Sequence, residues 1–262
     1  VNPENFTFNL SPEHLKRSVT KKPVMTDSYN ASWRSKNEYV SAELMKLEKE
    51  LGRKVTLTEK ATITSAIIAG QNQAFPICKV IKDFMIEIVK DVIGIQGKNK
   101  IRWETPCGSQ IIQRYNQSKL ERIQTYAMGG ANHYTVTSPN GEAAEGAIQL
   151  TINREQEDTV AAGDHALGLS PNYHHSLDAY ICQQAILLAG TDNIATCHDC
   201  FYYRPGEVVR GVKGVKDAFY KLVTSDVLQN LLEANEVENM YVPNFGTDEL
   251  LKDFDDAKYC FH

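Results

Sequence analysis

The spacing of apolar residues predicts that the first hundred residues are mainly helical. Residues 12–34 read as one helix, and residues 38–51 repeat apolar side chains at helical spacing before Gly52, a residue type that often follows a helix end. The helical pattern continues over residues 58–69 and 74–93. The last of these segments carries an apolar stripe that predicts a core-facing side: Ile77, Ile81, Phe84, Ile88 and Val92.

After residue 100 the pattern becomes that of strands. Residues 103–115 predict two short strands joined by a turn at Pro106-Cys107-Gly108. Farther along, residues 121–137 and 146–153 alternate apolar and polar side chains on either side of the turn-forming sequence Ser138-Pro139-Asn140-Gly141. We therefore expect a long β-hairpin in this part of the chain.

The last third of the chain combines helices with one further hairpin. Residues 179–188 predict a helix that Gly190 ends, and residues 212–235 predict another helix. Between them, residues 194–203 read as strand–turn–strand, with Asp199 in the turn. Helices, then a hairpin insertion, then a mixed final segment indicate the α+β class.

The composition narrows the function classes. The chain has 262 residues, of which 42% are hydrophobic, enough for one large domain or two small ones. A net charge of −5 counts against a free-standing nucleic-acid binder, which is usually basic, although a local basic groove is compatible with it. No apolar run reaches the ~18 residues of a membrane span, and the polar start shows no signal peptide.

The six cysteines do not form a dense disulfide framework in a chain of this length. Cys197 and Cys200 make one C-x-x-C pair, but no second pair lies at the spacing of zinc ligands. We therefore expect reduced, partly buried thiols in a cytosolic protein, with a structural zinc site as the alternative.

Asp199 is the first candidate for chemistry. Its carboxylate lies between apolar and aromatic runs and directly follows His198. Oxygen ligands suit Mg²⁺, and catalytic Mg²⁺ is usually held by only one or two protein carboxylates together with substrate phosphates. The alternative is that Asp199 simply forms the turn, a common role for aspartate.

A second candidate lies near the N-terminus. Arg17, Lys21, Met25 and Tyr29 are spaced by four, so on a helix they share one face. Two cations one turn apart can bind adjacent phosphates of a nucleotide, and an aromatic ring beyond them can lie against a base or sugar. The alternative is a solvated basic face with Tyr29 packed inward.

These segments together resemble the C-terminal portion of the single-subunit, phage-type DNA-dependent RNA polymerases. Residues 17–29 are similar to the fingers helix of that family, motif B. Residues 171–178 are similar to its Pro-Asn-Phe-x-His-Ser-x-Asp segment, and residues 197–201 to its His-Asp-Ser-Phe motif C. Its Trp-x-Thr-Pro-x-Gly pattern is matched by Trp103, Thr105, Pro106 and Gly108. The order and spacing of these motifs agree over residues 11–262.

The resemblance implies the fold of a right-hand polymerase. Residues 1–169 would form the fingers, mostly helical, with a hairpin of about residues 121–164 in the place of the family's specificity loop. Residues 170–262 would form the C-terminal part of the palm, including motif C and the C-terminal tail.

The resemblance also implies roles in two-metal nucleotidyl transfer. Asp199 would be a ligand of the catalytic Mg²⁺ ions, which activate the RNA 3′-OH and stabilise the leaving group. Lys21 would neutralise the incoming triphosphate and could protonate the departing pyrophosphate. Arg17 would add a second, bidentate phosphate contact.

Three further residues would act at the sugar and the primer. Tyr29 and His175 would recognise the ribose 2′-OH, the group that distinguishes RNA precursors from DNA precursors. His198 would support the turn or the primer end. Together with the two cations, these residues also form the binding site implied for the nucleoside triphosphate.

Departures from the family pattern carry their own expectations. Pro23 lies inside the fingers helix, where proline removes a hydrogen bond at about 3 kcal/mol and predicts a kink near Lys21. Asn30 replaces a glycine, and asparagine tolerates left-handed backbone better than most residues. Cys200 replaces the serine of motif C. DNA polymerase relatives carry glutamate at this position, and neither cysteine nor serine resembles glutamate. The residue therefore favours an RNA polymerase over a DNA polymerase.

The first metal-binding aspartate of the family lies upstream of motif B, and only ten residues precede Ser11. We therefore expect the C-terminal subunit of a heterodimeric phage RNA polymerase. A partner subunit would supply that aspartate, the thumb and the N-terminal domain. The enzyme would act on DNA template, nascent RNA and NTPs in the cytoplasm of an infected bacterial host, with no membrane association. The alternatives are a fragment of a full-length polymerase and a non-catalytic nucleic-acid-binding or scaffold protein.

Overall fold

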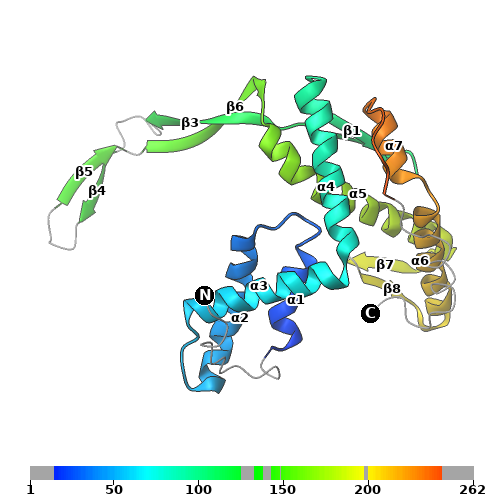
Figure 1. The fold of residues 1–262 in the computed structure, drawn as a ribbon, viewed down its shortest axis with the longest axis horizontal. Coiled ribbons are helices and arrows are strands. Elements are labelled where there is room, and N and C mark those ends of the chain that lie inside the picture. The colour runs from blue at the N-terminus through cyan, green and yellow to red at the C-terminus, as the bar shows by residue number, and fades with distance from the viewer. Residues whose placement is uncertain (1–14, 125–132, 138–142, 148, 198–199, 244–262) are drawn as a thin grey trace.

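The computed structural model describes residues 15–124, 133–137, 143–147, 149–197 and 200–243 (Figure 1). The described residues combine helices with four two-stranded antiparallel sheets, which confirms the α+β class. None of the helices in these ranges is both long enough and apolar enough to cross a bilayer.

The first lobe is a group of three helices. They are α1 (Arg17–Met25), α2 (Trp33–Leu51) and α3 (Leu57–Ala74). As the apolar spacing predicts, α2 ends at Gly52, which adopts a left-handed φ of 63°. The N-terminus of α3 is fixed by a capping box between Thr56 and Glu59. The lobe buries one apolar cluster: Val19, Val40, Leu44, Leu47, Val55 and Ile63.

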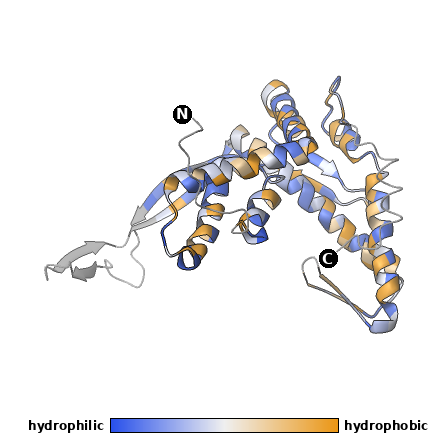
Figure 2. Cartoon of the chain, turned by 60° about the horizontal axis from the view of Figure 1, so that its bottom comes forward, coloured by the Kyte–Doolittle hydropathy of each residue, from blue (hydrophilic) through white to orange (hydrophobic). Residues whose placement is uncertain are grey.

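The second core lies where α4 (Pro76–Val89) meets α5 (Ala162–Ala189). A π-helical turn, η3 (Lys90–Ile95), extends α4 toward β1 (Ile101–Glu104), and α7 (Val227–Ala234) closes the other side. Hydrophobic and hydrophilic residues alternate along these helices, so each buries only part of its surface (Figure 2). The fully buried side chains here are Met85, Ile88, Val92, Ile101, Leu169 and Leu231.

The predicted hairpins are confirmed. β1 pairs with β2 (Gln110–Gln113), and the turn between them contains Gly108 at a φ of +86°. The long ribbon consists of two pairs, β3 (Asn116–Gln124) with β6 (Gln149–Val160) and β4 (His133–Thr137) with β5 (Ala143–Ala147). It projects away from the rest of the molecule (Figure 1). The predicted tip at residues 138–141 lies outside the described residues.

A third group of elements supports the last hairpin. β7 (Ile194–Cys197) pairs with β8 (Cys200–Tyr203), and the short 3₁₀ turn η4 (Pro205–Glu207) leads into α6 (Val208–Val223). The approach of α6 to α5 depends on Gly214. A Cβ at this position would lie 2.8 Å from the carbonyl oxygen of Ala185 and 2.8 Å from the backbone nitrogen of Ala189.

Three helix predictions are wrong. Residues 12–34 do not form one helix, because α1 ends two residues after Pro23 and Asn30 takes a left-handed φ of 57°. The helix predicted at 179–188 begins at Ala162, and Pro171 lies inside it. The single helix predicted at 212–235 is divided into α6 and α7. The predicted boundary between fingers and palm, at residues 169 and 170, falls inside α5. This boundary stays a prediction.

An ion cluster fixes the turn after α1. The side chain of Asp27 is buried and accepts hydrogen bonds from Lys36 of α2 and Lys82 of α4, the latter at 2.8 Å. Burial alone would raise the pKa of the Asp27 carboxyl, but the two lysines outweigh it and hold that pKa below its usual range. The turn is therefore tied to two helices from different parts of the chain.

We expect Gly214→Ala to destabilise the protein by about 1–3 kcal/mol, because the added methyl group collides with backbone that cannot move aside cheaply. Chemical denaturation measures the change. Gly70→Ala in α3 is the matched control, because nothing lies within 4 Å of its added Cβ. Alanine there should be neutral or stabilising by about 0.5–1 kcal/mol. Equal effects of the two substitutions would contradict the close approach of α6 to α5.

We expect Asp27→Asn to lower the free energy of unfolding by about 3–5 kcal/mol, because the buried ammonium of Lys36 loses its counter-charge. Folding lowers the pKa of Asp27. Its stabilising effect is therefore present above the ordinary carboxyl value of 3.8 and lost as the pH falls through the lower folded value. Unfolding curves recorded between neutral and acidic pH should show a larger loss of stability in the wild type than in the variant, which keeps other carboxyls with a lowered pKa, such as Glu59.

Asp217→Asn is the control for the ion cluster. Asp217 pairs with Lys213 on the exposed surface of α6. Its loss should cost less than about 1 kcal/mol, as for other surface ion pairs. A cost at Asp27 as small as that at Asp217 would show that the cluster does not hold the turn.

Candidate functional site

Two exposed cations lie on α1. Arg17 opens the helix and Lys21 follows one turn later, so both side chains project from the same face, as their spacing predicts. Val19 and Pro23 face the core of the helical lobe instead. Neither Arg17 nor Lys21 makes a hydrogen bond or ion pair through its side-chain nitrogens to the described residues, so both charges are available to a ligand.

Tyr29 does not lie on the helix with these cations. After Met25 the chain makes a hydrogen-bonded turn, in which the N–H of Tyr29 donates to the carbonyl of Thr26 at 3.2 Å and that of Asn30 to Asp27 at 3.1 Å. The left-handed φ of Asn30 then redirects the backbone toward α2. The prediction of one face from Arg17 to Tyr29 is therefore wrong for Tyr29, because the helix ends first.

The same turn docks onto α5. The hydroxyl of Ser170 donates to the carbonyl of Ser28 at 2.7 Å, and the side-chain amide of Asn30 donates to the carbonyl of Ala166 at 3.4 Å. As a result the rings of Tyr29 and His175 are in contact, with centroids 4.8 Å apart and an interplanar angle of 43°. The structure brings these two predicted residues together although they lie far apart in the sequence.

The position of α5 is fixed by polar contacts on its other sides. The indole N–H of Trp103 donates to the hydroxyl of Ser176 at 2.9 Å, which links two of the segments that resemble the polymerase motifs. The phenol of Tyr173 donates to the carbonyl of Val227 at 2.7 Å. Nδ1 of His174 donates to the carbonyl of Ser170 at 2.6 Å, since a carbonyl can only accept. These bonds hold the helix that presents His175.

A buried polar network joins α5 to the base of the long ribbon. The side chain of His165 is fully buried, and its Nε2 accepts from the backbone N–H of Tyr115 at 3.2 Å. The amide of Asn172 donates to Gln113 at 2.9 Å and to the Tyr115 hydroxyl at 3.0 Å. Burial lowers the pKa of His165, which keeps the ring neutral. Sequence reasoning missed this network because its members are scattered polar residues with no shared spacing.

The strand–turn–strand predicted around Asp199 is confirmed in its two strands. Cys197 and Cys200 are directly opposite each other in the antiparallel register. The two residues that connect them, His198 and Asp199, lie outside the described residues. In Figure 1 the hairpin runs from α6 toward the lobe that carries α1.

The described residues offer no cluster of three or more His, Cys, Asp or Glu side chains that could hold a metal ion. Asp27 lies close to Lys21 in the sequence, but its carboxylate is already occupied by two lysines. It does not fit the role of a second metal ligand, so Asp199 remains the candidate carboxylate.

Comparisons with known proteins agree with these motifs. The family profile described as DNA-dependent RNA polymerase matches residues 3–255. A "Probable DNA-directed RNA polymerase" of Gelasinospora sp. (strain G114) is 25% identical over 247 residues, which cover 86% of this chain and 27% of that protein. "DNA-directed RNA polymerase 2, chloroplastic/mitochondrial" of Arabidopsis thaliana is 21% identical over 244 residues, which cover 90% of this chain and 21% of that protein.

The chain thus spans about a quarter of the length of these relatives. The profile nevertheless extends over nearly all of it, from before α1 to beyond α7. The three-helix lobe, the projecting ribbon and the motif C hairpin all lie within the matched range. The chain belongs to the DNA-dependent RNA polymerase family.

Proposed function

We propose that this chain binds the incoming nucleoside triphosphate and contributes a metal-binding carboxylate in a DNA-directed RNA polymerase. The reaction is the transfer of a nucleotide to the RNA 3′ end on a DNA template. The observation that carries the proposal is the contact between Tyr29 and His175, which joins motif B to α5 in one site. The polymerase names of the relatives support the same activity.

The two cations of α1 suit the triphosphate. Lys21 places a point charge near the phosphates and, as an ammonium, can give a proton to the departing pyrophosphate. Arg17 offers a planar guanidinium that binds phosphate oxygens in a bidentate manner. Because both side chains are exposed and without described partners, they lose no internal ion pair when the nucleotide binds.

The ribose would lie against the Tyr29–His175 pair. A phenol hydroxyl and an imidazole both form hydrogen bonds with a 2′-OH, whereas a deoxyribose leaves them without that partner. The turn holds Tyr29 through the hydrogen bond between Ser170 and Ser28, so the pair is preorganised before the sugar arrives.

Asp199 would hold Mg²⁺, for which a carboxylate with substrate phosphates is a suitable donor set. When bound, the ion lowers the pKa of the attacking hydroxyl and stabilises charge on the leaving group. His198 would support the turn or the primer end from the adjacent position. As the resemblance to the family implies, the other metal-binding aspartate would come from a partner subunit.

The last hairpin supports the need for a partner. β7 and β8 form a two-stranded sheet, and one of its faces carries the exposed side chains of Ala195 and Tyr202. Two strands alone are marginally stable in water. Further palm structure from a second polypeptide, which would also bring the thumb and N-terminal domain, would cover this surface. Location in the cytoplasm of an infected bacterium stays a prediction.

We expect Lys21→Ala to reduce nucleotide incorporation by about 10²–10³-fold, the range for loss of one preorganised group at a developing charge. Primer extension by the complete enzyme, with its partner chain, measures the rate, and template binding should be unchanged. Lys22→Ala is the matched control, because that ammonium lies 5.9 Å from the ring centroid of Tyr39. It should change the rate by less than about fivefold. Incorporation that survives Lys21→Ala would remove Lys21 from catalysis, whereas no incorporation by the wild-type enzyme would favour a non-catalytic scaffold protein.

We expect Tyr29→Phe to reduce discrimination against deoxynucleotides by about tenfold, the effect of one lost hydrogen bond. The measurement is the ratio of kcat/KM for a ribonucleotide to that for its deoxy counterpart. The aromatic contact with His175 remains in this variant, so incorporation of ribonucleotides should persist. Tyr39→Phe serves as the control and should leave the ratio unaltered. An unchanged ratio in Tyr29→Phe would remove Tyr29 from sugar recognition.

A further inference from the structure

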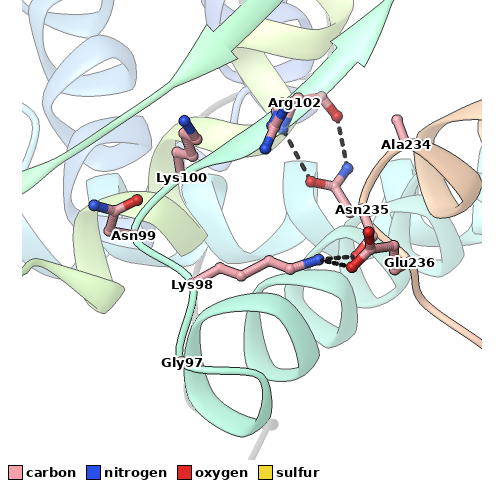
Figure 3. A pocket seen from close by; sticks show the side chains of 8 residues that line it. All are labelled: Gly97, Lys98, Asn99, Lys100, Arg102, Ala234, Asn235 and Glu236. Atoms are coloured by element: carbon pink, nitrogen blue, oxygen red, sulfur yellow. Dashed lines mark hydrogen bonds and ion pairs between the residues drawn. The ribbon is translucent and has the colours of Figure 1, made fainter.

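A basic cleft lies on elements other than α1, the helix that carries Arg17 and Lys21. It has a volume of about 360 Å³ and is formed where the chain leaves the π-helical turn η3 and enters β1, facing the end of α7. Figure 3 shows its lining side chains, among them Lys98, Lys100, Arg102, Asn235 and Glu236. None of these residues belongs to the motifs assigned to nucleotide binding.

The cations face solvent because their neighbours face the core. Ile101 and Trp103 are 0% and 2% exposed, so the alternate positions, Lys100 and Arg102, lie on the outer side of the strand. Residues two apart on a strand are separated by roughly 6.5–7 Å, so the two charges are distinct but close. Neither makes a side-chain hydrogen bond or a close ion pair with the described residues, although the charge of Arg102 contributes to lowering the pKa of the nearby Glu236 carboxyl. Both are therefore available to an anion.

The third cation is neutralised within the cleft. The ammonium of Lys98 donates to the carboxylate of Glu236 at 2.7 Å and to the carbonyl of Asn235 at 2.9 Å (Figure 3). Glu236 holds a left-handed φ of 58° at the end of α7, where the N–H of Val237 bonds back to Leu232. The cleft thus keeps an excess of two positive charges, those of Lys100 and Arg102.

The wall of the cleft is rigid. The buried side chain of Asn235 accepts from the backbone N–H of Arg102 at 3.0 Å and donates to its carbonyl at 2.6 Å, as a neighbouring strand would. It also donates to the carbonyl of Leu231 at 2.8 Å. This amide closes the free edge of β1 and fixes the backbone from which Arg102 projects. A preorganised cation binds a ligand with less loss of conformational entropy.

We propose that the cleft binds backbone phosphates of a nucleic-acid strand, as a contact separate from the nucleotide site. Two cations two residues apart, Lys100 just before β1 and Arg102 within it, suit successive anionic groups of one chain rather than a single compact anion. The cleft offers no aromatic ring on which a base could stack, so the contact would be insensitive to sequence. That the bound strand is the DNA template or the RNA product rests on the proposed polymerase function.

The test is the affinity of the full chain for a fluorescein-labelled oligothymidylate, measured by fluorescence anisotropy over a series of salt concentrations. We expect Lys100→Ala combined with Arg102→Ala to raise Kd about five- to tenfold. The slope of log K against log salt should become shallower by about 1.4, because two fewer phosphates are neutralised. An oligouridylate and a DNA duplex of equal length distinguish RNA product, single-stranded template and duplex.

The matched control is Lys46→Ala combined with Lys49→Ala. This variant removes the same charge from the exposed side of α2, in the other lobe. It should leave Kd within about twofold and the salt slope unchanged. Circular dichroism of both double variants checks that the fold is retained. If the cleft variant and the control have equal slopes, the proposal is wrong.

Two further outcomes separate this proposal from other interpretations. A peptide with the acidic sequence of residues 248–256 could bind the wild-type chain and not the cleft variant, with oligonucleotide affinity unaffected. That result would overturn the proposal and assign the cleft to an acidic peptide. The assay involves no nucleotide addition. The absence of nucleotide incorporation by the wild-type complete enzyme would therefore reject the polymerase proposal alone, while equal slopes reject the cleft alone.

Discussion

The buried carboxylate of Asp27 connects three helices beneath the turn that carries Tyr29. Lys36 arrives from α2 and Lys82 from α4, and burial strengthens the attraction because little water screens it. This pairing ties the turn between α1 and α2 to α4, and the hydrogen bonds of Ser170 and Asn30 tie the same turn to α5. The orientation of Arg17 and Lys21 relative to α5 therefore depends on interactions that touch no substrate.

The candidate nucleotide site is built across two cores. One wall is the short helix α1, and the other is the first half of α5, held by bonds from Trp103 and the Tyr115–Gln113 network. The distance between the rings of Tyr29 and His175 is maintained only if both cores keep their relative positions. The hydrogen bonds made by the side chains of Ser170 and Asn30 connect the turn after α1 to α5 and so fix the relative positions of the two cores. The same dependence makes the site sensitive to distant packing, such as that of α6 on α5.

Charge is distributed unevenly over a chain that is acidic overall. Arg17 and Lys21 lie on α1, and Lys100 and Arg102 lie at β1. None of these four side chains makes a hydrogen bond or a close ion pair with the described residues. An acidic net charge limits non-specific binding to nucleic acid, while local cations can still bind phosphate at chosen positions. The two sets thus suit separate contacts along one extended ligand better than a single binding patch.

Much of the architecture followed from the sequence alone. Apolar periodicity located α2, α3 and α4, and turn chemistry located the hairpins. The motifs proposed Arg17, Lys21, Tyr29 and His175 as candidate site residues, which stay predictions. These features depend on the spacing of residue types over a few neighbouring positions, which can be read directly from the sequence. The sequence made α1 too long, because the helix ends two residues after Pro23. It began α5 too late, because Pro171 is tolerated inside a helix that tertiary packing stabilises.

Only the tertiary structure decided which of these residues meet. The pairing of Asp27 with Lys36 and Lys82, and the contact of Tyr29 with His175, join segments with no common period. Such contacts depend on how helices pack after they form, and many sequences with the same local pattern could pack otherwise. The sequence by itself determined the elements and the residue types of the site. Packing and buried hydrogen bonds determined their geometry, since these act between groups that are neighbours only in space.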